Sequence, residues 1–256
     1  MVFGTPRFGL KVKMKFSWIP YAPQIGRLLK VILPNNMTVP ILQGKLRGKK
    51  WIIGSGVIEM ALGSYEYEKR TLIERRVQNS SVFYDIGAHV GFYTLLASQL
   101  VGPDGKVIAF EPVCRNLNYL RRHLVINHCA NVVVIGAAVS DKNGIFPFSE
   151  GSNSSMGYLS DEGNLTVNTV SIDELVMNGE IAAPDYMKID VEGAELLVLK
   201  GAKATLSNCN VEMFLAIHNP KIHIDCRNFL TSLDYKVKPV VGDDLYNARE
   251  IFAYKE

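Results

Sequence analysis

The chain has 256 residues, 48% of them hydrophobic and 21% charged, with a formal net charge of +3. These values suit one large globular domain with a substantial core and exclude wholesale disorder. No apolar run reaches the ~18–20 residues that cross a bilayer, and lysines interrupt the N-terminal segment, so we expect neither a transmembrane segment nor a secretory leader. The four cysteines are widely spaced without a C-x-x-C pair, so we expect reduced thiols and a cytoplasmic location.

The charge is unevenly distributed along the chain. Residues 1–58 contain ten Lys or Arg and no acidic residue, whereas residues 59–256 contain 18 basic and 25 acidic residues. A basic segment of this kind can bind RNA or contact anionic lipid at a membrane surface. It can equally pack against the acidic remainder, and the alternation of its lysines with apolar residues favours this interpretation.

Residues 1–80 are predicted to form an N-terminal extension. An amphipathic helix is expected at 17–33, and its apolar face could lie in the core, at an interface or on a membrane. Two short strands are expected within 38–53, joined around the glycines and lysines of 44–50. Apolar residues at helical spacing predict a helix at 66–78 that leads into the main domain.

From residue 81 to 256 short apolar strands alternate with helical stretches. Strands are expected at 82–86, 106–111, 131–139, 186–190 and 211–218, and helices at 91–100, 115–128, 172–177 and 193–206. This alternation predicts an α/β domain with a mostly parallel, doubly wound sheet covered on both faces. Two final strand-like runs, 235–241 and 250–254, predict a closing antiparallel hairpin, and residues 143–170 are expected to be an irregular insertion.

The strongest motif is VFYDIGAHVGFYT at 82–94, a strand that ends in an acid and a glycine turn that opens a helix. Gly87 permits a tight turn close to a ligand, and Gly91 permits the helix to pack against the strand. The next strand ends twenty residues later at Glu111, which can accept hydrogen bonds from the hydroxyls of a ribose. The pattern therefore predicts a nucleoside site.

The position of Asp85 indicates which nucleotide is bound. Its carboxylate stands two residues before Gly87, where it would repel the pyrophosphate of a dinucleotide. A carboxylate at this position suits a phosphate-free ligand with an ammonium and a sulfonium. We therefore favour S-adenosylmethionine over NAD, and over an incidental strand-to-helix turn.

A second motif, YMKIDVEGAE at 186–195, places Asp190 and Glu192 at the carboxyl end of another strand. Ligands bind beyond these strand ends in open α/β sheets, so both acids are expected to face the transferring methyl group. They could orient a hydroxyl or an ammonium, act as a general base, or hold a cation, and we assign no metal site. Glu195 follows in the first turn of a helix, where it suits the helix dipole.

These blocks, with VIAFEP at 107–112 and MKIDVEGAELLVLKGA at 187–202, resemble the FkbM family of S-adenosylmethionine-dependent methyltransferases. The resemblance runs from Gly63 to His218 and implies the seven-stranded class I methyltransferase fold, which is Rossmann-like. It implies a cofactor loop, a ribose acid and an active-site rim at Asp190 and Glu192. The cofactor-binding residues that we predict are Asp85, Gly87, Ala88, His89, Gly91, Thr94, Glu111, Pro112 and Asp141.

The chain departs from the family pattern at two positions. His89 stands where the family usually has Asn, and either donates to the cofactor carboxylate or makes a simple loop contact. Ala216 stands where the family often has an acid, which leaves His218 as the candidate on this strand. The loop at 138–141 resembles the place where relatives contact adenine, which is the basis for including Asp141.

The predicted function is O-methylation of a hydroxyl on a sugar, lipid or small metabolite, with Asp190, Glu192 and His218 as catalytic candidates. An RNA methyltransferase that uses the basic segment is the first alternative. A non-catalytic binding module with this fold and a nicotinamide dehydrogenase are the others. The acceptor partner is therefore expected to be a small molecule or glycan, with RNA as the alternative, and no feature of the sequence favours a particular oligomeric state.

Overall fold

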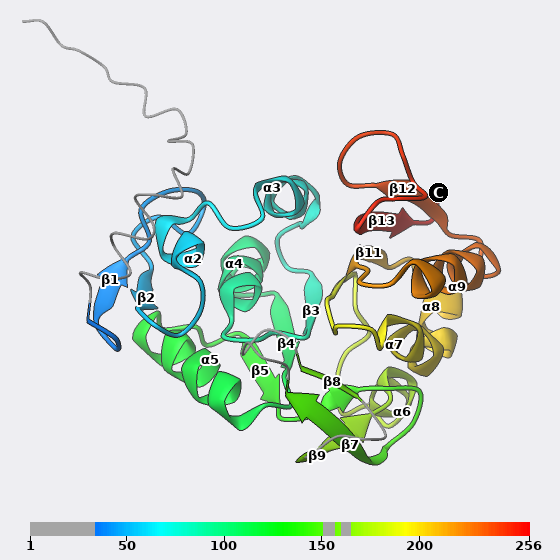
Figure 1. The fold of residues 1–256 in the computed structure, drawn as a ribbon, viewed down its shortest axis with the longest axis horizontal. Helices are drawn as coiled ribbons and strands as arrows, with labels where there is room; N and C mark the ends of the chain where they lie inside the picture. Colours follow the sequence, from blue (N-terminus) through cyan, green and yellow to red (C-terminus); the bar gives the residue numbers. More distant parts are fainter. Residues whose placement is uncertain (1–33, 151–156, 160–164) are drawn as a thin grey trace, which may run out of the picture.

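A central seven-stranded sheet organises the molecule (Figure 1), and the computed structural model describes residues 34–150, 157–159 and 165–256. The strand order is β12-β13-β11-β10-β3-β4-β5. The strands are β3 (Val82–Ile86), β4 (Lys106–Phe110), β5 (Val132–Ile135), β10 (Tyr186–Ile189), β11 (Glu212–Ala216), β12 (Lys236–Pro239) and β13 (Glu250–Tyr254). All neighbours pair in parallel except β13, which is antiparallel to β11 and β12. This topology confirms the predicted doubly wound sheet with a C-terminal antiparallel hairpin.

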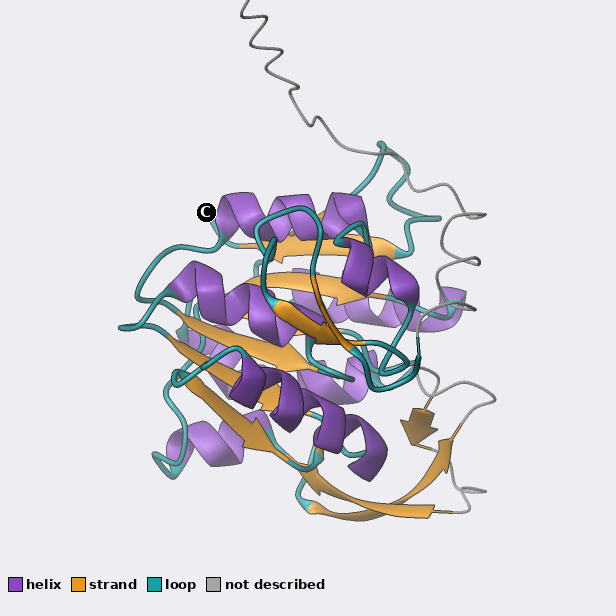
Figure 2. Ribbon diagram, turned by 90° about the vertical axis from the view of Figure 1, so that its left-hand side faces the viewer, coloured by secondary structure: helices purple, strands orange, loops and turns teal. Residues whose placement is uncertain are grey.

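Helices cover both faces of this sheet, and Figure 2 shows the strands between helices in front and behind. One layer contains α4 (Phe92–Val101) and α5 (Cys114–Ile126), and the other contains α6 (Ile172–Met177), α7 (Glu195–Gly201), α8 (Lys203–Asn208) and α9 (Pro220–Thr231). Side chains alternate along each strand, so Phe83 belongs to the same core as Leu96 of α4 on one face, while Tyr84 belongs to the same core as Leu199 of α7 on the other. The helix predicted at 193–206 is divided at Ala202 into α7 and α8.

The described part of the N-terminal extension packs onto the α4–α5 layer. It contains β1 (Thr38–Pro40), β2 (Lys50–Ile52), α2 (Ile58–Leu62) and α3 (Tyr67–Arg76). Trp51 is buried and stacks on the imidazole of His123 from α5, with 3.9 Å between ring centroids. Residues 34–80 therefore share one hydrophobic core with the α4–α5 layer. The helix predicted at 17–33 lies outside the described residues.

The prediction of an irregular insertion at 143–170 was wrong. Three strands lie there, β7 (Gly144–Glu150), β8 (Gly157–Leu159) and β9 (Leu165–Val170), and they form a second sheet with β6 (Ala138–Val139) in the order β6-β9-β7-β8. The run predicted as one strand at 131–139 is divided between the two sheets as β5 and β6. In β9, Val167 and Thr169 are buried, and the residues between and before them are exposed. The sequence showed no clear apolar alternation there, because the buried position 169 is a polar threonine.

The structure also bears on membrane insertion. Within the described residues, no helix has both the length and the apolar character that crossing a bilayer requires.

Candidate active site

The loops after β3 and β10 meet at the point where the strand order of the central sheet reverses, which is where open α/β sheets bind ligands. Gly87 has a φ of +77°, and a Cβ built on it would lie 1.9 Å from the backbone oxygen of Asp190. A side chain at this position is therefore excluded both by the backbone conformation and by the neighbouring loop. Gly87 brings the two loops into direct contact.

The carboxylate of Asp85 lies beneath the glycine loop and is fully buried. The hydroxyl of Thr94 donates to its Oδ2 at 2.6 Å, and the ammonium of Lys188 lies 3.3 Å from its Oδ1. Lys188 also donates to the backbone oxygen of Gly87 at 2.8 Å. Because β3 and β10 pair Asp85 with Lys188 directly, the carboxylate is compensated by the protein.

A first cavity, which we call the nucleoside cavity, lies beyond the ends of β3 and β4. The side chain of Glu111 lies in its wall and accepts hydrogen bonds from three groups, the backbone N–H groups of His89 and Val113 and the side-chain amide of Asn116. Burial raises the pKa of Glu111, although these three hydrogen bonds oppose the shift. Apolar side chains supply the remaining walls, among them Phe110, Val113, Val139 and Phe148. This combination of one carboxylate and apolar surfaces suits a ribose and a base.

A second cavity, the central cavity, lies between α3 and the strand ends. Aromatic rings of Tyr65, Phe92 and Tyr93 line it together with the carboxylates of Glu66, Asp190, Glu192 and Glu250. It shares Gly87, His89, Asp190 and Glu192 with the nucleoside cavity. The two cavities therefore adjoin along the glycine loop and the end of β10.

Lys69 of α3 forms ion pairs with three of the carboxylates around the central cavity. Its Nζ lies 2.6 Å from Glu66, 2.8 Å from Glu250 and 3.4 Å from Asp190, and its side chain is 2% exposed. Burial alone lowers the pKa of Lys69, but the carboxylates outweigh burial and raise it. Burial raises the pKa of Glu250 to about 7, against the opposing effect of Lys69.

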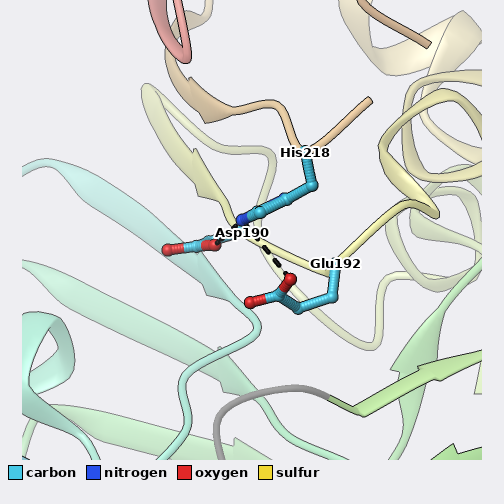
Figure 3. Close-up of side chains that lie close together, drawn as sticks. All are labelled: Asp190, Glu192 and His218. Atoms are coloured by element: carbon cyan, nitrogen blue, oxygen red, sulfur yellow. Dashed lines mark ion pairs between the residues drawn. The ribbon is translucent and has the colours of Figure 1, made fainter. Parts of the chain in front are cut away.

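Asp190, Glu192 and His218 converge at the border of these cavities (Figure 3). Nε2 of His218 lies 3.6 Å from Oδ1 of Asp190 and 3.5 Å from Oε2 of Glu192. On the other side of the ring, Nδ1 donates to Oε1 of Glu195 at 2.8 Å. The Glu195 hydrogen bond is the main cause that raises the pKa of His218, while Lys188, Lys69 and His218 together outweigh burial and lower the pKa of Asp190.

A third cavity of about 450 Å³, the outer cavity, opens on the far side of His218. Polar side chains of His218, Asn219, Tyr246, Asn247 and Arg249 line it. It shares Ala216, His218 and Glu250 with the central cavity. The three cavities thus adjoin in a row, and the Asp190–Glu192–His218 cluster lies in the middle of it.

A family model described as the methyltransferase FkbM domain matches residues 85–237. The chain belongs to the FkbM methyltransferase family. Its S-adenosylmethionine-dependent, Rossmann-like methyltransferase domain is the one that the sequence motifs predicted.

One curated relative and two solved structures extend this comparison. The hexuronic acid methyltransferase AglP of Haloferax volcanii is 32% identical over 143 residues, which are 55% of this chain and 57% of the relative. The chain thus spans little more than half the length of that protein. The FkbM methyltransferase of Methylobacillus flagellatus KT superposes with a TM-score of 0.53 and 22% identity, covering 70% of this chain and 44% of that one. The S-adenosylmethionine-dependent O-methyltransferase of Thermotoga maritima gives a TM-score of 0.50 and 13% identity, covering 86% and 78%. At these identities both structures show the fold alone.

The structure brings together only some of the predicted FkbM cofactor residues. The residues that line the nucleoside or central cavity are Gly87, Ala88, His89, Glu111 and Pro112. Four others line none of the three cavities: Asp85, Gly91, Thr94 and Asp141. The binding of the cofactor by these four residues stays a prediction.

Each of the four has a physical reason for its place. Asp85 is fully buried, and the hydroxyl of Thr94 donates to it beneath the loop. Gly91 has a φ of +91° and packs against Leu120. Asp141 is exposed, whereas Ala138 and Val139 from the same loop form the cavity wall.

Sequence reasoning missed Lys69 and Glu250, and gave Lys188 no role. The lysine in the otherwise apolar YMKI strand could have predicted a buried ion pair, because an unpaired ammonium is costly to bury. Glu195 was assigned to the helix dipole, and the structure adds its bond to His218. His89 has a φ of 50°, in the left-handed region that Asn and His tolerate better than most residues, so it suits the place of the family's Asn.

Proposed function

We propose that this FkbM protein transfers a methyl group from S-adenosylmethionine to an oxygen of a sugar or sugar-acid acceptor. The family supports methyl transfer, and the name of the curated relative, a hexuronic acid methyltransferase, supports the sugar-acid class. The observation that carries the proposal is the row of three adjoining cavities with Asp190 and His218 at its middle. Such an arrangement holds two reactants on opposite sides of one polar cluster.

The cavities fit the chemistry of the cofactor. Glu111 and the apolar walls suit the adenosine, and the carboxylates and aromatic rings of the central cavity suit an ammonium and a sulfonium. The bound cofactor supplies an electrophilic methyl group on its sulfonium. Glu250 and Glu66 accept hydrogen bonds or cations while Lys69 fixes their positions.

The outer cavity supports the assignment of a sugar acceptor. Its volume lies within the roughly 300–1,000 Å³ of ordinary ligand pockets, and its polar side chains can bond several hydroxyl groups. Arg249 is exposed in its wall and can pair with the carboxylate of a sugar acid. The acceptor oxygen then reaches the cluster at His218, where a basic side chain takes its proton as the new bond forms.

A methyl-donor assay tests the proposal. The protein is incubated with isotope-labelled S-adenosylmethionine and, separately, with uronic acids, neutral hexoses, lipid extract and RNA. We expect label in the uronic-acid product, with a lower rate on neutral hexoses. Label in RNA alone would favour the basic segment as a nucleic-acid surface, and the absence of cofactor binding by calorimetry would overturn methyl transfer altogether.

A further inference from the structure

We propose that Asp190, Glu192 and His218 bind one divalent metal ion at the edge of the central cavity, which all three residues line. This inference goes beyond the proposed function, because metal binding can be measured without an acceptor. The three residues come from two neighbouring strand ends, after β10 and after β11. Each offers one ligand atom, and these three atoms all lie within 4.8 Å of one another.

The distances between the side-chain atoms of the cluster are longer than hydrogen bonds and close to those between ligands of one metal ion. The 3.5 and 3.6 Å between Nε2 of His218 and the two carboxylate oxygens exceed the ordinary hydrogen-bond range of about 2.7–3.2 Å. Ligand atoms at about 2.1 Å from one metal ion lie roughly 3.0–3.4 Å apart when they are neighbours in its coordination sphere. Small side-chain rotations therefore place all three atoms on one ion.

Glu195 is an independent observation that points to the same ion. It has no exposed side-chain surface, and its Oε1 accepts the Nδ1–H of His218 and the backbone N–H of Gly193. This bond turns Nε2 toward the two carboxylates, as in the carboxylate–histidine–metal arrangement of many metal sites. The other oxygen, Oε2, is buried and has no hydrogen-bond partner among the described residues.

Carboxylates outnumber the buried lysines around the cluster. In the described part of the chain, two buried lysines, Lys69 and Lys188, stand among six carboxylates: Glu66, Asp85, Asp190, Glu192, Glu195 and Glu250. Both lysines approach Asp190 at Oδ2. Its Oδ1 faces His218, which leaves one oxygen of Asp190 for a metal ion.

The donor set selects the class of ion. One imidazole nitrogen with two carboxylate oxygens suits Mn²⁺, Fe²⁺ or Zn²⁺ better than Mg²⁺ or Ca²⁺, which prefer oxygen ligands throughout. Three protein ligands leave coordination positions open toward the cavities that the cluster lines. An acceptor hydroxyl bound there would have a lowered pKa and a fixed direction toward the methyl group.

Titration of the full-length protein with Mn²⁺ tests the site. After chelator treatment and dialysis at pH 8, we expect calorimetry and electron paramagnetic resonance to show one saturable Mn²⁺ site per chain. His218→Ala and Glu192→Gln should each weaken the affinity at least tenfold, and Glu195→Gln by about 10–100-fold. His128→Asn removes an exposed imidazole at a φ of 56°, which Asn tolerates, and should leave the affinity unchanged.

The outcomes separate this site from the proposed function. Saturable binding that Glu192→Gln weakens supports the site even where His218→Ala fails to fold. No saturable binding, or equal affinity in His218→Ala, Glu192→Gln and His128→Asn, overturns the site. If the protein binds no Mn²⁺ and still transfers methyl groups in the presence of chelator, the metal site is overturned and the proposed function stands. If the protein binds Mn²⁺ but transfers no methyl group to any acceptor, the metal site stands and the proposed function is overturned.

Discussion

The Nδ1–H of His218 donates a 2.8 Å hydrogen bond to the buried carboxylate of Glu195, twenty-three residues earlier in the chain. The bond fixes the ring so that Nε2 faces Asp190 and Glu192. Asp190 and Glu192 follow β10, His218 follows β11, and Glu195 begins α7. The contact therefore joins a helix N-terminus to the strand ends that carry the reactive side chains.

Replacing Glu195 with Gln should lower the pKa of His218, because the Glu195 hydrogen bond is the largest cause that raises it. The amide oxygen can still accept the Nδ1–H, so the ring should remain in place while its basicity falls. NMR titration of the imidazole in chelator measures the shift. We expect kcat to fall about tenfold with the KM for the cofactor unchanged. A pKa equal to that of the wild type would show that Glu195 has no electrostatic effect on the ring.

Replacing Lys69 with Met should lower the free energy of unfolding by about 3 kcal/mol, because it leaves the half-buried carboxylates of Glu66 and Glu250 without their cation. Urea denaturation measures the change. Lys45→Met removes an exposed lysine and should stay within about 0.5 kcal/mol of the wild type.

A second substitution separates the charge of Lys69 from its packing. Glu250→Gln on the Lys69→Met background removes one of the uncompensated acids, so it should restore part of the stability. If the double variant loses as much free energy of unfolding as the two single variants lose together, Lys69 stabilises the fold through packing and not through its charge.

Replacing Glu111 with Gln should raise the Kd for S-adenosylmethionine about tenfold, because an amide replaces a carboxylate as the acceptor for the ribose. Calorimetry with the purified protein measures the affinity. Glu68→Gln changes an exposed acid of α3 and serves as the matched control. Equal affinity in the two variants would place the ribose elsewhere.

Local sequence pattern was enough to locate the elements of the central sheet. The run VFYDI predicted β3 with both of its ends, and residues 172–177 were predicted as the helix α6 with both of its ends. Each of these elements is specified by its own residues. A strand that is buried on both faces of the sheet needs a continuous apolar run, and a helix with one buried face needs apolar residues at intervals of three or four. The same alternation of elements predicted the mostly parallel sheet, whereas the strand order came from the structure.

The cavity walls were harder to predict, because residues far apart in sequence form them. Lys69 on α3 meets Glu250 on β13 across most of the chain, and no spacing rule connects two such positions. Phe148 reaches the nucleoside cavity from β7 of the second sheet, a segment that was not predicted to be a strand. Asp85 had the expected position on β3, but Lys188 neutralises it, and that pairing depends on the register between two strands.

Replacing Gly87 with Ala should lower the free energy of unfolding by about 3 kcal/mol or more and weaken cofactor binding. The new Cβ would lie 1.9 Å from the backbone oxygen of Asp190, so the two loops must separate. Gly179→Ala is a matched control, because Gly179 has a φ of +71° with nothing within 4 Å of the added Cβ. The control should lose only the about 1 kcal/mol of left-handed strain. Equal losses in the two variants would show that the loop contact is unimportant.

His123 gives the fold a pH dependence of known sign. The ring is buried against Trp51, and in its neutral form Nδ1 donates to the backbone oxygen of Val90 while Nε2 accepts from the backbone N–H of Ile52. Burial lowers the pKa of His123 to about 4. The unfolded chain, with a pKa of about 6.5, binds the proton more readily, so stability is intact above pH 6.5 and falls as the pH drops toward 4.

Replacing His123 with Gln isolates this titration from that of the other groups. Gln can retain a donor and an acceptor but cannot take up a proton, so the variant should be less stable at pH 7.5 and respond less to acid. From pH 7.5 to pH 5, the wild type should lose about 2 kcal/mol more of its free energy of unfolding than the variant loses. Urea denaturation at the two pH values gives both numbers. Equal losses would mean that the imidazole is protonated inside the fold, which would require Ile52 to give up its hydrogen bond and the stack on Trp51 to hold a charged ring.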